Sequence, residues 1–312
     1  MSAPTPVTEA TSDPPATVTA PTPAPVPATA PAPARTARPA RTRGLGRRVG
    51  HAALGIGFIA LLVLLWDLGV RGEWVLLFDI KMGFLPPPLE VAKLMWDFAF
   101  GGVYDDAYSG TLWSHLGASA FRVLAGFALA AALAIPIGVL MGRSEIVRAT
   151  LDPAVNLFRP IPATAWVPLV LLIIGFGSQA TIFLIVLSAF FPILLNTITA
   201  TREVSPRLVE AARMLGTSRL GVLLKVVVPA ATPGIVSGLR IGLGLGWVIL
   251  VLGEANGIDT GLGSMIMIAR EQVRTDRVVV GMIVIGIAGY LSDRVLVLGL
   301  KGLFGRRPLV RA

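Results

Sequence analysis

The chain of 312 residues contains no cysteine and only two histidines, and charged residues make up just 14% of it. The lack of cysteine excludes disulfides, thiolate metal sites and thiol nucleophiles. Soluble domains usually carry about 25% charged residues, so the charge content is low. Hydrophobic residues make up 54% of the chain and the mean hydropathy is +0.76. This balance predicts a polytopic membrane protein.

The sequence also lacks the motifs of nucleotide-binding proteins, enzymes and metal sites. It has no G-x-x-x-x-G-K-[ST] segment and therefore no P-loop for nucleotide phosphates. No Ser/His/Asp arrangement, no carboxylate pair at helical spacing within an apolar run and no histidine cluster is present. We therefore predict a non-catalytic chain without a metal or other cofactor. His51 and His115 stand at the ends of apolar runs and have no partners at metal-ligand spacing.

Two further absences bear on partners. The net charge of +9 comes without a clustered basic groove and interleaved aromatic residues, so no nucleic-acid partner is expected. No Asp or Glu lies in the middle of a long apolar run, whereas proton- or sodium-coupled carriers usually place an acidic residue near the membrane midplane. The energy source is therefore expected on another polypeptide.

Residues 1–50 differ in composition from the rest of the chain. Eleven of the 24 prolines lie in the first 40 residues, among Ala and Thr, which predicts a disordered Pro/Ala-rich tail. Basic residues then precede the first apolar run: Arg35, Arg38, Arg41, Arg43, Arg47 and Arg48. A cleaved signal peptide is the alternative, but the long tail and the long apolar run favour a retained anchor with its N-terminus inside the cell.

Six apolar runs are long enough to cross a bilayer, which takes about 20 residues. They lie at about 51–70, 117–141, 161–176, 179–200, 230–252 and 278–297. The predicted fold class is all-α, a polytopic membrane protein with about six transmembrane helices, with the lipid bilayer around it. In the segment "LPPPLEVAKLMWDFAF", apolar residues recur at helical spacing after Leu89, which predicts a short amphipathic helix that packs on the outer face.

The distribution of basic residues predicts the orientation. With the N-terminus inside, the inner segments (the tail, 142–160, 201–229 and 301–312) hold 18 of the 27 Lys and Arg, whereas the outer segments 71–116 and 253–277 hold six. Lys and Arg accumulate in cytoplasmic loops. Both termini are therefore expected in the cytoplasm.

Small residues recur four apart in two of the predicted spans. One series is Gly126, Ala130, Ala134, Gly138 and Gly142, and the other is Gly234, Gly238, Gly242 and Gly246. Such stripes allow helix backbones to approach closely in lipid. They indicate either static packing or a face that slides during a transport cycle.

Arg240 is the most interior ionisable residue of the predicted spans, and Trp247 follows two helical turns later. A charge inside the membrane is costly, so its presence suggests a function. One hypothesis places Asn196, Arg240 and Trp247 around a substrate path that fits an anion. The alternative is that Arg240 snorkels to the interface or pairs with a neighbouring helix end.

The segment 201–229, between the fourth and fifth spans, is amphipathic and basic. Ser205 suits the N-cap of a helix, Pro206 suits its first position, and Gly216 suits the left-handed residue that ends it. Thr217 or Ser218 then caps a second helix that runs from Arg219 to about Val228. Two short helices hinged at Gly216 would suit docking into a groove of a soluble partner.

This segment resembles the "EAA" loop of the membrane subunits of binding-protein-dependent ABC importers. Glu210, Ala211, Ala212, Gly216 and Pro229 occupy the motif positions. The segments "FRVLAGFALAAALAIPIGVLMGRS", "LDPAVNLFRPIPATAWVPLVLLIIGFG" and "AFFPILLNT" are also similar to the nitrate/sulfonate/taurine branch of these permeases. The resemblance covers about residues 85–300.

The resemblance implies a type I ABC importer transmembrane fold for residues 51–312, in a multi-pass protein of the bacterial plasma (inner) membrane. It implies a dimer of two permease copies, two ABC ATPase subunits and an extracytoplasmic solute-binding protein. It also assigns residues to the loop that couples to the ATPase: Glu210, Ala211, Ala212, Leu215, Gly216 and Pro229. The solute would be a small anion containing nitrogen or sulfur.

Two other functions stay open at this point. A secondary carrier or channel would work without an ATPase, although the missing midplane acid and the docking loop disfavour it. A membrane scaffold would use the same loop only to recruit a soluble partner. Co-purification of an ATPase through residues 201–229 would separate the importer from a carrier or channel.

Overall fold

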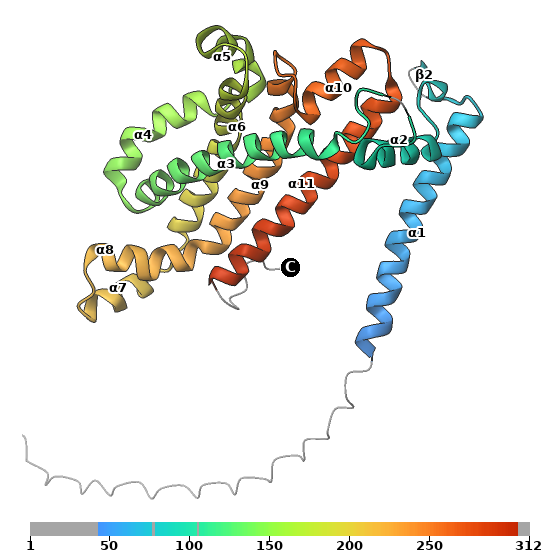
Figure 1. Cartoon of the computed structure of the whole chain (residues 1–312). Helices are drawn as coiled ribbons and strands as arrows, with labels where there is room; N and C mark the ends of the chain where they lie inside the picture. The colour runs from blue at the N-terminus through green and yellow to red at the C-terminus, as the bar shows by residue number, and fades with distance from the viewer. Residues whose placement is uncertain (1–42, 77–78, 105, 305–312) are drawn as a thin grey trace, which may run out of the picture. The chain divides into compact units, whose positions relative to one another are not determined.

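The computed structural model describes residues 43–76, 79–104 and 106–304, and these are almost entirely helical (Figure 1). The N-terminal tail, for which disorder is predicted, lies outside the described residues, and so does the C-terminal end of the chain. Residues 56–312 belong to one compact unit.

The elements follow one another along the chain with short connections. They are α1 (Arg43–Arg71), β1 (Val75–Leu76), β2 (Ile80–Lys81), α2 (Pro88–Phe100), α3 (Leu112–Arg143), α4 (Glu145–Phe158), α5 (Val167–Ile174), α6 (Ser178–Arg202), α7 (Pro206–Met214), α8 (Arg219–Val222), α9 (Val228–Glu254), α10 (Leu262–Glu271) and α11 (Thr275–Phe304). The two strands form one antiparallel pair, with Val75 opposite Lys81 and Leu76 opposite Ile80.

Five helical segments of the described chain are long and apolar enough to cross a membrane, and a bent pair raises the number to six. The five are Ala53–Arg71, Leu112–Arg143, Ser178–Arg202, Arg219–Glu254 and Thr275–Gly302. The polytopic all-α prediction is therefore confirmed. The first of these segments nearly coincides with its predicted span, and the other four extend beyond theirs, most of all Arg219–Glu254, which starts well before the predicted residue 230.

The bent pair lies where the third span was expected, at 161–176. There the chain forms a 3-10 turn at Ala163–Trp166 and α5. The preceding helix α4 lies in the segment 142–160 that was predicted as an inner loop, and the two helical parts meet at 79°. By itself α5 has eight residues, far fewer than a span needs. Pro160 and Pro162 lie in the break, and each lacks the backbone N–H that a continuing helix would need.

At the centre of the bundle α3 and α9 both pack against α6, and they also contact each other. A β-carbon at Gly138 of α3 would lie 2.7 Å from Thr197 Cβ, and one at Gly238 of α9 would lie 2.7 Å from Asn196 Cβ. Only glycine permits these approaches. Both small-residue stripes therefore pack closely against the same central helix, as their spacing predicts. Whether either face slides during transport stays a prediction.

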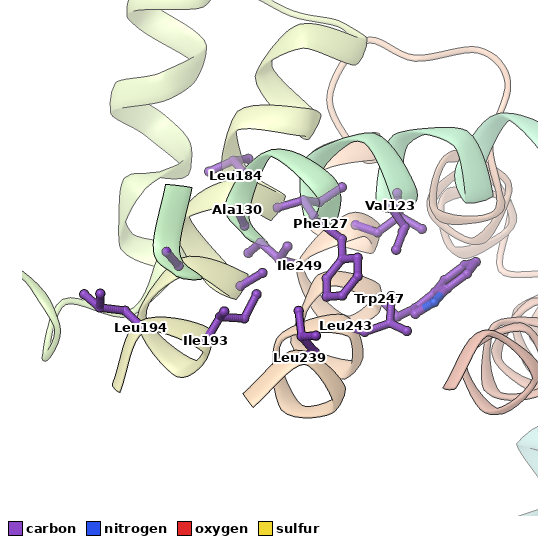
Figure 2. Close-up of a cluster of buried hydrophobic side chains, with 14 of the residues drawn as sticks. Val123, Phe127, Ala130, Leu184, Ile193, Leu194, Leu239, Leu243, Trp247 and Ile249 are labelled. Carbon is purple, nitrogen blue, oxygen red and sulfur yellow. The ribbon is translucent and has the colours of Figure 1, made fainter. Parts of the chain in front are cut away.

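Apolar side chains fill the space between these three helices (Figure 2). Val123 of α3, Leu184 and Ile193 of α6, and Leu250 of α9 are fully buried. In lipid, helices associate largely through close packing of their side chains, and the dispersion attraction between these buried side chains stabilises the contact. This rigid core positions the polar groups described below.

The amphipathic helix predicted after Leu89 is α2. Val91, Leu94 and Phe98 are buried, which confirms its role as a packing element. Its Asp97 organises the following loop, because Oδ1 accepts hydrogen bonds from the backbone N–H groups of Tyr104 (2.9 Å) and Val103 (2.8 Å). The Tyr104 hydrogen bond is the main reason why the pKa of Asp97 lies below its ordinary value, against the opposing effect of burial.

Candidate functional site

The loop between α6 and α9 has the two-helix geometry expected of it. Helix α7 starts at Pro206 and ends in a Schellman motif, in which Thr217 N–H donates to Ala212 O (3.1 Å) and Gly216 N–H to Arg213 O (2.9 Å). Gly216 has φ = 77°, a left-handed conformation that side-chain-bearing residues rarely adopt. Ser205 occupies the N-cap position but makes no side-chain capping bond.

The two faces of α7 have different environments. Val209 and Ala212 are buried on the side that packs against the following helical segment. The other side of the helix is exposed and carries two large apolar side chains, Met214 and Leu215, which are 90% and 85% exposed. Arg207 and Arg213 of α7 are exposed as well. We call the following set of exposed residues the α7 face: Leu208, Glu210, Ala211, Met214, Leu215 and Gly216.

The second helix continues directly into the membrane-spanning segment. Ser218 caps α8 by accepting a hydrogen bond from Gly221 N–H (3.2 Å), and a π-helical turn at Leu223–Val227 joins α8 to α9. Pro229 was expected to separate the second helix from the span. Instead it lies in the first turn of α9, where a missing N–H removes few intrahelical bonds, and residues 219–254 form one long helical segment.

Helices α7 and α8 lie at the end of the bundle opposite α10 (Figure 1). The α7 face is thus presented at the end where α6 finishes and α9 begins, away from the loop held by Asp97. A rigid turn displays two large apolar side chains there. An exposed apolar patch of this kind is typical of a protein-binding surface.

Arg240 and Trp247 of α9 both contact α11, at adjacent residues. Arg240 Nε and Nη2 donate to the two carboxylate oxygens of Asp293 at 2.6 and 2.9 Å. Trp247 Nε1 donates to Ser292 Oγ at 3.0 Å. The alternative in which Arg240 pairs with a neighbouring helix therefore describes its contact in this structure.

Asn196 lies apart from these two residues. Its side-chain amide donates to Pro192 O within α6 at 2.8 Å, and its Cβ faces Gly238 of α9. Arg240 is two residues beyond Gly238, which places it about 200° further around the helix. Asn196 therefore faces α9 whereas Arg240 and Trp247 contact α11, and a substrate path around the three residues stays a prediction.

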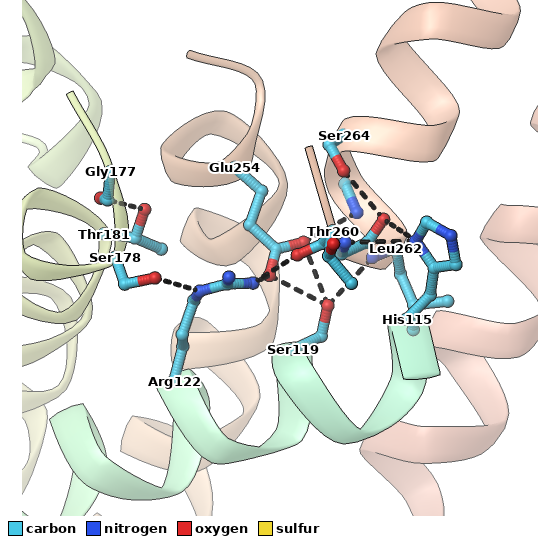
Figure 3. Close-up of polar contacts among 12 residues, drawn as sticks. His115, Ser119, Arg122, Gly177, Ser178, Thr181, Glu254, Thr260, Leu262 and Ser264 are labelled. Carbon is cyan, nitrogen blue, oxygen red and sulfur yellow. Dashed lines mark hydrogen bonds and ion pairs between the residues drawn. The ribbon is translucent and has the colours of Figure 1, made fainter. Parts of the chain in front are cut away.

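A buried polar cluster connects α3, α9 and α10 (Figure 3). Glu254, at the end of α9, is 0% exposed. Its carboxylate accepts hydrogen bonds from Arg122 Nη1 (2.6 Å), Ser119 Oγ (2.8 Å) and Gly263 N–H (2.8 Å). Every partner of this carboxylate is a hydrogen-bond donor, and these bonds fix the turn before α10.

Further bonds extend this cluster. Arg122 Nε donates to Ser178 Oγ (2.9 Å), and Arg122 Nη1 also donates to Thr260 O (2.8 Å). The backbone N–H of Leu262 donates to Ser119 Oγ (2.8 Å). Sequence reasoning missed the cluster because Arg122 and Glu254 are 132 residues apart, and each stands at the end of an apolar run. The one sequence feature that pointed to the cluster was the pair of polar residues Ser119 and Arg122, three apart and therefore on the same face of a predicted helix.

The structure offers no metal-binding arrangement among the residues it describes, since no group of three His, Cys, Asp or Glu side chains converges there. His115 packs between Phe98 and Tyr108, and its Nδ1 lies 2.9 Å from Gly261 O. These are contacts of a packed side chain.

Comparison with known proteins gives a consistent set of relatives. The profile of the family described as "binding-protein-dependent transport system inner membrane component" matches residues 134–308. The chain is 39% identical to the taurine transport system permease protein TauC of Escherichia coli, over 81% of this chain and 88% of that protein. It is 30% identical to the nitrate import permease protein NrtB of Synechocystis, over 76% of this chain and 83% of that protein.

A third sequence relative is the putative aliphatic sulfonates transport permease protein SsuC of Escherichia coli, which is 34% identical over 79% of this chain and 87% of that protein. Among solved structures, the chain is similar to an inward-facing methionine ABC transporter, MetNI. The similarity has 24% identity and a TM-score of 0.48, over 70% of this chain and 99% of that chain.

Proposed function

The chain belongs to the binding-protein-dependent transport system inner membrane components, as an ABC importer permease of the taurine, sulfonate and nitrate type, and we propose that a separate ATPase drives it through the α7 face. The chain contains no P-loop, so ATP hydrolysis falls to the partner. Family and composition place the protein in the inner membrane.

The observation that carries this proposal is the exposed apolar α7 face next to a rigid glycine turn. Leu208, Ala211 and Leu215 recur at helical spacing on the exposed side, so they can enter a groove together. Glu210 lies on the exposed surface of the same helix and offers a charge-assisted contact to a basic group of the partner. Motion of the ATPase would then be transmitted through α8 to α9, because these two helices are continuous.

We further propose the assembly and its orientation. Two copies of the permease form the pathway, two ATPase subunits bind the α7 faces, and an extracytoplasmic binding protein delivers the solute. The excess of basic residues in the segments expected on the α7 side supports an orientation with that side, and both termini, in the cytoplasm. Because the relatives are permeases for taurine, aliphatic sulfonates and nitrate, the proposed cargo is a small nitrogen- or sulfur-containing anion.

A secondary carrier or channel is the competing function. Such a carrier would need an acidic side chain free to exchange protons or ions. Glu254 is the fully buried carboxylate of the described bundle, and it is held by Arg122 and Ser119. An acid bonded in this way is a poor exchange group, which favours the ATPase-driven importer.

The test is co-purification of the ATPase with substituted permeases. Leu215→Asp changes a side chain that is 85% exposed, so it should leave folding intact and reduce the co-purified ATPase at least about tenfold, which is about 1.4 kcal/mol of binding energy. Val273→Asp is the matched control, since Val273 is 78% exposed between α10 and α11 and should retain the ATPase. Equal amounts of ATPase with both variants would reject docking through the α7 face.

A further inference from the structure

A cavity of about 440 Å³ lies where the broken span α4/α5 bends against α6 and α9. The bend contributes Arg159 and residues 161–164, α6 contributes residues between Leu187 and Leu195, and α9 contributes residues between Leu245 and Ile249. These positions are close to the middle of α6 and in the outer half of α9. The cavity therefore lies well inside the thickness of the bundle, although the sequence places Arg159 in an inner loop.

Arg159 is the charged residue that lines this cavity. Other arginines inside the bundle hold a carboxylate, as Arg122 holds Glu254 and Arg240 holds Asp293. Among the described residues, Arg159 has no ion-pair partner and its side chain makes no hydrogen bond. Its side chain is exposed, so the unpaired guanidinium is accessible to a ligand that enters the cavity, which marks it as a candidate ligand-binding group.

The remaining lining defines what such a ligand would look like. Most of the wall is aliphatic or aromatic, and two hydroxyl groups, those of Thr164 and Ser188, are part of it. A guanidinium binds an oxyanion through two parallel hydrogen bonds, while apolar walls suit an aliphatic body. No carboxylate of the described chain lines the cavity, so a cationic solute would find no counter-ion there.

Resting on the proposed function, we propose that Arg159 binds the anionic head of the transported solute in this cavity, as a specificity-determining group of the pathway. The break between α4 and α5 is the structural reason for the site, because an interrupted span allows a polar side chain and free backbone groups to face a cavity rather than lipid. The anion supplies the missing counter-charge while it passes.

The first experiment uses the absence of cysteine from this chain. Thr164→Cys introduces a single thiol in the cavity wall, in the assembled transporter. Its labelling rate is measured with the anionic 2-sulfonatoethyl and the cationic 2-trimethylammonioethyl methanethiosulfonates, each divided by the rate of a free thiol. We expect the anion-to-cation ratio to fall about tenfold when Arg159→Gln is added, as expected for removal of a nearby unit charge.

Arg148→Gln is the matched control for that experiment. Arg148 stands on the same helix and lies 3.9 Å from Glu145, outside the cavity, so the ratio should stay within about twofold of the unsubstituted background, because the fixed charge near Thr164 is unchanged. An unchanged ratio in Arg159→Gln, or an equal fall in Arg148→Gln, would overturn the role of Arg159.

The second experiment measures ATP-dependent uptake of ethanesulfonate in proteoliposomes with the ATPase and the binding protein. Arg159→Gln should lower the maximal rate about tenfold while the binding protein's affinity is unchanged, and Arg159→Lys should retain at least about a third of the rate because it keeps the charge. Normal co-purification of the ATPase establishes that the variants assemble.

The outcomes separate the two proposals. If the wild-type complex imports the anion and Arg159→Gln imports it equally fast, the role of Arg159 fails while the importer function stands. If the wild-type complex imports neither ethanesulfonate, taurine nor nitrate, the proposed function fails and the cargo assignment of Arg159 fails with it.

Discussion

Substituting Glu254 by Gln tests how strongly the buried polar cluster stabilises the end of the bundle at α10. The carboxylate is 0% exposed and accepts bonds from Arg122, Ser119 and Gly263 N–H. A glutamine keeps the size but presents an NH₂ group to donors, and it leaves the Arg122 guanidinium without its counter-ion. Breaking a buried ion pair by removing one partner costs about 3–5 kcal/mol, so we expect a destabilisation of this size.

The assay is reversible unfolding of the purified permease in mixed micelles with increasing SDS, followed by tryptophan fluorescence. Glu271→Gln, an exposed substitution of the same kind, should change the free energy of unfolding by no more than about 0.5 kcal/mol. The double variant Arg122→Gln/Glu254→Gln should cost less than the sum of the single variants, since it leaves no unpaired charge. A loss below about 1 kcal/mol for Glu254→Gln, or additive single effects, would refute the reasoning.

Three further predictions use the same unfolding assay or the uptake assay. Gly238→Ala places a β-carbon 2.7 Å from Asn196 Cβ and should lower the free energy of unfolding by about 1–3 kcal/mol. Gly244→Ala, whose β-carbon would have nothing within 4 Å, should leave it unchanged or raise it by up to about 1 kcal/mol. Similar effects of the two substitutions would contradict the packing of α9 on α6. Asp97→Asn should destabilise the protein at neutral pH, because the folded pKa of Asp97 is depressed and its contribution is present above the unfolded pKa of about 3.9. The difference in free energy of unfolding between Asp97→Asn and the wild type should become smaller as the pH falls below that value. A difference that stays constant with pH would argue against the hydrogen bonds from the loop to the Asp97 carboxylate. At Gly216, where φ is 77° and no atom lies within 4 Å of a β-carbon, Val should reduce uptake more than Asn at equal membrane levels, because Asn tolerates the left-handed conformation better; equal uptake would reject conformational strain as the cause.

The elements that depend on local pattern were predictable from sequence. The long apolar helices, the end of α7 at a left-handed Gly216 and the buried face of α2 all follow from periodicity, capping and glycine chemistry acting over a few residues. The stripes of small residues also predicted close packing. Which helix they would meet could not be derived, because α3 and α9 present similar stripes and both contact α6.

The features that depend on distant contacts were not predictable. Glu254 appeared as a loop residue, and only the fold brings it to Arg122 and Ser119. The 79° break between α4 and α5 was hidden by an apolar composition that continues through the prolines. Because the break was hidden, Arg159 was predicted to lie in an inner loop. The predicted substrate path was centred on Arg240 instead, and the structure shows Arg240 paired with Asp293.

The central claim is that this permease works only with an ATPase. The most direct test is uptake of radiolabelled ethanesulfonate into proteoliposomes that contain the permease, with ATPase, binding protein and ATP supplied or omitted one at a time. The account predicts uptake only when all are present, and its loss when Leu215→Asp replaces the wild-type permease. Uptake by the permease alone, driven by a proton or sodium gradient, would contradict it.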